Sequence, residues 1–328
     1  MKVRTGIILL AVVLAIAARA VLIATPFAYT PDIYYYDTQA VQALASGQNP
    51  YGHDYVVPPW LATAGAENVF AYLPMVLLFL FPFGLAGDVR VGLVACDALV
   101  AIGLYLLRGK WADVVAAAFL LLPFTVLFST WYPNNTLVGM AMLGMGIALR
   151  MLDRQWTSAI FVGLSLGASQ LVWLFYPFVL SQSLRERKFA QVLVTLATAA
   201  AVVLPFVLVN PNAFFSNTIL FEFERPVQGL VTAQAFGINV NPTLGGLATT
   251  LLGVALPFVL KAALATAGLA FLLFRTRSPE SATLNGSYFL LFAIFILPNN
   301  FSWWYLELPF QTLLTWFLIS KGSIANKP

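Results

Sequence analysis

The chain has 328 residues, of which 60% are hydrophobic and 9% charged, and its formal net charge is +4. Apolar runs of about 15–25 residues recur along it, which predicts repeated transmembrane helices and excludes a soluble globular protein. Basic residues gather at the ends of these runs, as in membrane proteins, so the positive charge does not indicate nucleic-acid binding. A single cysteine, Cys96, excludes an intramolecular disulfide.

The N-terminal segment has the pattern of a cleavable signal peptide. Lys2 and Arg4 precede an apolar run that ends in small residues at Ala18–Ala20. The run continues through Val21–Ala24, however, which makes it long enough to span a bilayer. We therefore expect a retained first anchor, with cleavage as the alternative.

The expected fold is an all-α, polytopic membrane bundle of about 8–12 transmembrane helices, with ten favoured. The ten segments cover about 5–24, 72–87, 91–107, 113–131, 136–151, 157–181, 189–209, 244–274, 285–298 and 304–320. Two of these segments fit poorly as single transmembrane helices. The segment 157–181 has Ser169 and Gln170 at its centre, and 244–274 contains Pro257. Either one can instead form a pair of short re-entrant helices.

The Lys and Arg residues favour a cytoplasmic N-terminus. With ten spans, the cytoplasmic set is Lys2, Arg4, Arg90, Arg185, Arg187, Lys188, Arg275, Arg277, Lys321 and Lys327, and the outer set is Arg108, Lys110, Arg150, Arg154 and Arg225. Re-entry at 157–181 would move Arg150 and Arg154 to the cytoplasmic side. Residues 1–328 then form one integral membrane domain with outer loops at 25–71 and 210–243.

The first outer loop, 25–71, is predicted to contain a short interfacial helix over about 31–46. Thr30 suits the N-cap, Pro31 the first helical position and Gly47 the C-terminal stop.

One face of this predicted helix is a candidate site. Asp32, Tyr35, Tyr36 and Gln39 would share it, since residues three and four apart are neighbours. The plainer interpretation is that Asp32 only offsets the helix dipole, which also makes its carboxylate a weaker base.

Several motifs occur in a fixed order along the chain. They are Asp32, Gly47-Gln48-Asn49-Pro50-Tyr51, Tyr72-Leu73-Pro74, Cys96-Asp97, Pro133-Asn134-Asn135, the segment Gly163–Pro177, and Asn300-Phe301-Ser302-Trp303-Trp304-Tyr305. Together they resemble the membrane-embedded GT-C glycosyltransferases, especially the mannosyltransferases that use polyprenyl- or dolichyl-phosphate sugars.

This resemblance implies a hexosyltransferase that moves a sugar, mannose first, from a polyprenyl-phosphate donor. The acceptor would be a lipid-linked glycan, a glycolipid or a surface polymer on the outer face of the cell membrane, or of the ER membrane in a eukaryote. The reaction would invert the anomeric centre without a cofactor. Asp32 takes the place of the general base, with Asp37 as the second candidate. A divalent ion held by Asp32, Asp37 or Asp54 is the less favoured alternative.

A leaving prenyl phosphate needs cations or donors near its developing charge. Arg225 in the second outer loop is the first candidate, and its plainer role is to pair with Glu222 or Glu224 or to bind a lipid headgroup. His53 is a substitute cation or else a solvated loop residue. Lys261 can reach the donor phosphate from a helix break.

The chain departs from the resembled family at two places. The Ser-Trp stretch near the end has no histidine, and Gln170 stands where a lysine is common. Both changes remove potential phosphate contacts.

Aromatic residues are frequent at the predicted outer interface. They are Tyr34, Tyr35, Tyr36, Trp60, Trp303, Trp304 and Tyr305. An interfacial belt is their general role, and a platform that stacks on a sugar ring is the sharper hypothesis. Asp97, inside a predicted span, requires a partner or water.

Two other functions compete with the glycosyltransferase. A transporter or lipid flippase should show paired repeats with broken helices at matching positions, and the sequence contains no clear pair. A non-catalytic subunit of the same fold is the other alternative.

Overall fold

The computed structural model describes residues 2–25, 31–59, 69–107, 112–221, 244, 248–249, 252–253 and 256–296. Its first half contains α1 (Lys2–Ala24), α2 (Asp32–Ala45), the 3-10 turn η1 (Pro50–Gly52), α4 (Pro74–Leu85), α5 (Val89–Leu106), α6 (Ala112–Leu121), α7 (Pro123–Ser129) and α8 (Thr136–Met151). Its second half contains α9 (Gln155–Leu166), α10 (Gln170–Arg185), α11 (Phe189–Val209), α12 (Pro211–Phe215), the π-helical turn η2 (Ser216–Leu220), α16 (Phe258–Arg275) and α17 (Pro279–Ile296).

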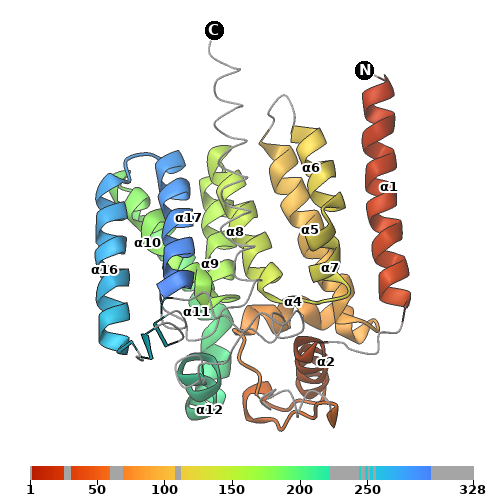
Figure 1. The fold of residues 1–328 in the computed structure, drawn as a ribbon, viewed down its shortest axis with the longest axis horizontal. Helices are drawn as coiled ribbons and strands as arrows, with labels where there is room; N and C mark the ends of the chain where they lie inside the picture. Colours follow the sequence, from red (N-terminus) through yellow and green to blue (C-terminus); the bar gives the residue numbers. More distant parts are fainter. Residues whose placement is uncertain are drawn as a thin grey trace.

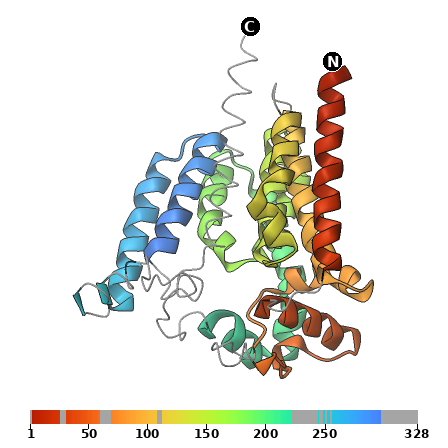
Figure 2. The ribbon, with the colours of Figure 1, turned by 45° about the vertical axis from the view of Figure 1, so that its right-hand side comes forward.

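The long helices run side by side and give the bundle two distinct ends (Figures 1 and 2). One end holds α2, η1 and α12, and we call it the α2 end. The other holds the first residues of α1 and the turns that join α8 to α9 and α16 to α17, and we call it the N-terminal end (Figure 1). The buried core lies toward the α2 end, where α2, α4, α5 and α8 meet.

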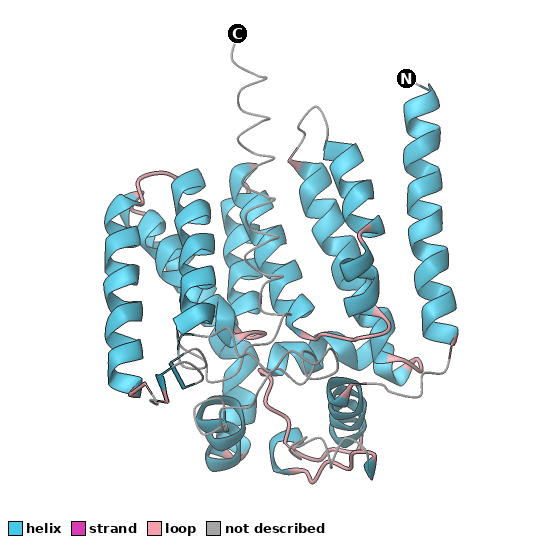
Figure 3. Ribbon diagram, viewed as in Figure 1, coloured by secondary structure: helices cyan, strands magenta, loops and turns pink. Residues whose placement is uncertain are grey.

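The described residues are helical and contain no β-strand, which confirms the all-α class (Figure 3). Helices long and apolar enough to cross a membrane are, within this part of the chain, Thr5–Ala24 of α1, α5 and α11. Only 11% of the α1 segment and 6% of α11 are buried, so both present apolar side chains where lipid would cover them. The total of ten spans stays a prediction.

The segment 72–87 does not form the expected crossing. Its helix, α4, has 12 residues, which makes it roughly 18 Å long against a hydrocarbon core of about 30 Å. Figures 1 and 2 show α4 across the α2 end of the bundle, beside α2. Gly84 allows this packing, because a Cβ there would come within 2.9 Å of the Val41 side chain.

The segment 157–181 is also not a single helix, since it divides at 167–169 into α9 and α10. The carbonyl of Gly167 at this break accepts a hydrogen bond from the Met75 amide of α4 at 2.9 Å. Protein thus covers the irregular backbone, as a membrane interior demands. The segment is therefore a pair of shorter helices rather than one long helix.

The two-helix arrangement brings the end of α8 to the end of α10. Arg150 donates to Ser183 Oγ at 3.0 Å and lies 3.5 Å from Glu186. Arg150 and Arg154 consequently lie at the N-terminal end, opposite to their place in the ten-span division. Arg90 differs in the opposite way. The ten-span division puts it on the same side as the N-terminus, but it donates to the Ile23 carbonyl at the end of α1 and so lies at the α2 end.

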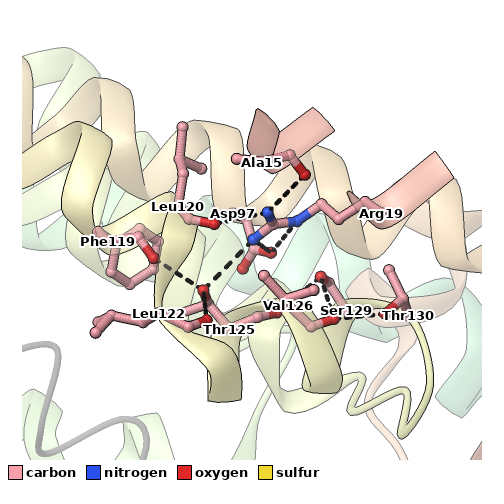
Figure 4. Close-up of polar contacts among 10 residues, drawn as sticks. All are labelled: Ala15, Arg19, Asp97, Phe119, Leu120, Leu122, Thr125, Val126, Ser129 and Thr130. Atoms are coloured by element: carbon pink, nitrogen blue, oxygen red, sulfur yellow. Dashed lines mark hydrogen bonds and ion pairs between the residues drawn. The ribbon is translucent and has the colours of Figure 1, made fainter. Parts of the chain in front are cut away.

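A buried ion pair fixes α1 to the rest of the bundle (Figure 4). Arg19 donates to Asp97 Oδ2 of α5 through Nη2 at 2.8 Å and through Nε at 3.2 Å. Its Nη1 donates to the Leu120 carbonyl at 2.7 Å, where α6 ends. Both side chains are almost completely buried. Asp97 therefore has the partner that a carboxyl inside an apolar helix bundle requires.

Replacing either member of this pair should destabilise the protein strongly. Arg19→Leu leaves the Asp97 carboxylate buried without its partner, and breaking a buried pair in this way costs about 3–5 kcal/mol. Asp97→Leu leaves the Arg19 guanidinium buried without its partner. Thermal unfolding of the purified protein in detergent measures the loss.

The double variant Arg19→Leu/Asp97→Leu provides the control. Because it removes both charges together, it should recover a large part of the stability lost in each single variant. A double variant less stable than either single one would show that the pair does not act as a unit.

Candidate functional site

The Asn-Pro-Tyr turn joins the first loop to the second. The Tyr51 hydroxyl donates to the Tyr72 carbonyl at 2.7 Å, and its ring packs edge-on against Phe206 of α11 and Phe214 of α12. Asn217 in η2 donates to the Tyr51 carbonyl at 2.9 Å. Tyr51 is thus a buried connector, which explains why this motif needs a tyrosine.

Gln170 strengthens the same connection. Its Nε2 donates to the Ala71 carbonyl and to the Thr218 carbonyl, each at 3.0 Å. The side chain that replaces the expected lysine therefore binds backbone on both sides of the α2 end.

The predicted short helix in the first loop is confirmed as α2, Asp32–Ala45. Its start differs by one residue, because Pro31 occupies the N-cap and makes no side-chain cap. Thr30 lies outside the described residues. Gly47 follows with φ +75°, which is the left-handed stop that the sequence predicts.

Asp37 is the most unusual acid of this loop. It is only 1% exposed, and its Oδ1 accepts from Asn135 Nδ2 of α8 at 3.0 Å. Its Oδ2 has no hydrogen-bond partner among the described residues. Burial raises the pKa of Asp37 to about 8, against the opposing effect of the Asn135 hydrogen bond, and the charge of Asp32 adds to the rise. Asp37 is therefore protonated at neutral pH.

Asp32 has a different environment on the same helix. It is half-buried at the first position of α2, and its Oδ1 accepts from the Ile33 amide at 2.9 Å. Its negative charge contributes to the raised pKa of Asp37 and of Tyr132, so it lies close to both groups. A pair of carboxyl groups in unlike environments is the usual arrangement for separate acid–base roles.

Gln39 and His53 both contact other residues of the first loop. Gln39 donates through Nε2 to the Val56 carbonyl at 2.7 Å and accepts from the Val56 amide at 2.9 Å. Its amide thus holds the loop against α2. His53 is half-buried, with its ring edge-on to Tyr55 at 5.2 Å.

The two predicted tyrosines of α2 separate. Tyr36 is buried and packs edge-on against Tyr55 at 5.8 Å, while Tyr35 is half-buried and packs edge-on against Tyr34. Only Tyr35 of the two is thus accessible for stacking on a ligand.

Several predicted donor-site residues lie outside the described residues: Arg225, Trp303, Trp304 and Tyr305, together with Trp60. Lys261 is described, in the first turn of α16 and at the end of that helix nearer to the α2 end. In the ranges that the structure describes, no three His, Cys, Asp or Glu side chains gather as a possible metal site.

Sequence reasoning missed the contact between Asn135 and Asp37. The sign of this contact in the sequence is the Asn134-Asn135 pair just before α8, and that pattern by itself indicates only the start of a helix. Asn134 in fact serves that end, since its Oδ1 accepts from the Thr136 amide at 3.0 Å. Asn134 is 1% exposed and so belongs to the buried part of this end of the bundle.

Comparisons with family models, with curated proteins and with solved structures find no match to this chain.

Asp37→Asn should change how stability depends on pH. The folded-state pKa of about 8 lies above the ordinary aspartate pKa of 3.8, so the folded state binds the proton more tightly. The stabilisation is complete below about pH 4 and is lost as the pH rises through 8, by up to about 1.4 kcal/mol per unit. Asparagine does not titrate, so the variant should lack this decline. Melting temperatures across the window measure the effect.

Asp54→Asn is the matched control, because Asp54 is an exposed carboxyl in the same loop. It should keep the wild-type slope. If the stability of Asp37→Asn falls with pH as steeply as that of wild type, another group titrates in this window.

Proposed function

We propose that this protein is a membrane glycosyltransferase of the GT-C type that transfers a sugar from a polyprenyl-phosphate donor. The observation that carries the proposal is the placement of Asp32 and Asp37 together on α2, a helix held at one end of an apolar bundle. The order of motifs along the chain supports the same reaction class. Mannose is the first donor sugar to test, and a lipid-linked glycan or glycolipid is the first class of acceptor.

In this proposal Asp32 is the general base. A sugar hydroxyl is a poor nucleophile, and a carboxylate within hydrogen-bond reach can take its proton as attack on the anomeric carbon proceeds. The bond from that carbon to the phosphate oxygen then breaks, and the negative charge stays on the leaving prenyl phosphate. Asp32 suits this role better than Asp37, since its side chain is half-buried rather than enclosed.

The distribution of positive charge supports an outward-facing α2 end. At the N-terminal end the described basic residues are Lys2, Arg4, Arg150, Arg154, Arg185, Arg187, Lys188, Arg275 and Arg277. Toward the α2 end the described basic residues are Arg90, which lies 2.6 Å from Asp88, and Lys261. Because Lys and Arg concentrate in cytoplasmic loops, this asymmetry supports an outer position for Asp32 and Asp37.

A transfer assay tests the reaction. Purified protein in liposomes receives radiolabelled polyprenyl-phosphate mannose and a lipid extract from its own membranes, with polyprenyl-phosphate glucose in parallel. Wild type should form a labelled product. Asp32→Asn should lose at least about a hundredfold in rate, the range that a positioned base contributes.

Asp54→Asn controls for the loss of a loop carboxyl and should keep the wild-type rate. An unchanged rate in folded Asp32→Asn would exclude Asp32 as the base. No product from wild type with either donor would favour a non-catalytic subunit or a transporter.

Cysteine labelling tests the orientation. In a Cys96→Ala background, Gln48→Cys places a thiol on an exposed residue of the α2 end, and Arg277→Cys places one at the N-terminal end. A membrane-impermeant maleimide should label the first in intact cells and the second only after permeabilisation. The reverse pattern would put the two acids on the cytoplasmic side.

A further inference from the structure

We propose that Asp37 and Asn135 together bind hydroxyl groups of the sugar substrate, and that Asp37 does so as a hydrogen-bonding side chain rather than as the base. This inference rests on the proposed function and deepens it, because it separates recognition of the sugar from proton transfer by Asp32.

The two side chains form one buried unit between α2 and α8. Asp37 is 1% exposed and Asn135 is fully enclosed, and the hydrogen bond between them is 3.0 Å long. Each has a second polar atom, Asp37 Oδ2 and Asn135 Oδ1, without a partner among the described residues. Buried polar atoms are rarely left in this state, so a pair of them indicates a missing ligand or water.

The surroundings favour the uncharged form of Asp37. Among the described residues, the titratable groups that act on it are Asp32 from α2 and Tyr55 from the loop that packs over the helix. Neither supplies a positive charge, and burial moves the pKa of Asp37 upward. Burial raises the pKa of Tyr55 as well, so its hydroxyl also keeps its proton.

An uncharged pair selects hydroxyl groups by its donor and acceptor count. With one N–H of the Asn135 amide bonded to Asp37, the pair leaves two donors, the Asp37 carboxyl O–H and the second N–H of Asn135, and one acceptor, Asn135 Oδ1. Rotating the amide by half a turn leaves two N–H donors on Asn135 and one acceptor at Asp37 Oδ2, which is the same count. A metal ion would leave the donors unpaired, and an anion would leave the acceptor unpaired. Only groups that both donate and accept can pair with all of these atoms, and neighbouring hydroxyls on a sugar ring supply this.

Infrared spectroscopy tests the protonation of Asp37 without any substrate. Wild type at neutral pH should show the carbonyl band of a protonated carboxyl, and the band should vanish near pH 8. Asp37→Asn should lack this band, and Asp54→Asn should retain it. Absence of an Asp37-dependent band at neutral pH would overturn the proposal.

Binding of simple sugars separates a sugar hydroxyl from a resident water. Methyl mannoside, methyl glucoside and methyl galactoside are added to the protein, and the melting temperature is followed. At least one should raise it in wild type and fail to do so in Asn135→Leu. Asn285→Ala removes a buried amide that bonds Thr276 in the α16–α17 pair, so it should behave as wild type. No stabilisation by any of the three would show that the pair holds water only, and would overturn the proposal.

Kinetics separate the two acids in the transfer assay. Because both side chains bind substrate in this proposal, Asp37→Leu and Asn135→Leu should each raise KM about tenfold, which equals about 1.4 kcal/mol of binding, whereas Asp32→Asn should lower kcat. Loss of turnover in Asp37→Asn as severe as in Asp32→Asn would make Asp37 the base and overturn the proposal. If wild type transfers no sugar, the proposed function fails, while the infrared and glycoside measurements still decide the role of the pair.

Discussion

The ion pair between Arg19 and Asp97 is the contact on which the arrangement of the first half of the chain depends. A charge inside a membrane bundle is stable only when a partner neutralises it and the remaining donors find acceptors. Asp97 and the Leu120 carbonyl meet these needs, so α1, α5 and the end of α6 have to meet at one place. Arg90 also donates to the Ile23 carbonyl, which fixes the position of the end of α1, the helix that precedes α2.

The α2 end is built around buried polar contacts as much as around apolar packing. Tyr51 and Gln170 bind backbone carbonyls of segments that are distant in sequence, and they draw the first and second loops against the ends of the helices. A membrane protein has to satisfy such carbonyls internally wherever its backbone leaves a helix. The loop that carries the acids is therefore part of the folded core, and α2 is held in a fixed place beside α8.

Asp32 and Asp37 show how one short helix produces two different acids. The two are five residues apart, so their side chains project from different faces of α2. Asp37 faces Asn135 and is enclosed, while Asp32 stays half-buried at the helix start. The chain thus offers an uncharged carboxyl for hydrogen bonding beside a charged one, with most of the described basic residues at the opposite end of the bundle.

The sequence by itself determined the helical class, the apolar character of α1 and α11, the extent of α2 to within one residue at each end and the stop at Gly47, because each of these follows from local composition and backbone preference. It also located the acids. Tertiary structure alone decided that 157–181 forms two helices and that α4 lies across the α2 end. Hydropathy records how apolar a segment is but not what covers it, and the Met75–Gly167 hydrogen bond that covers the break joins residues far apart in the chain. The partnership of Asp37 with Asn135 was hidden for the same reason, since no spacing rule connects residues that meet only through packing.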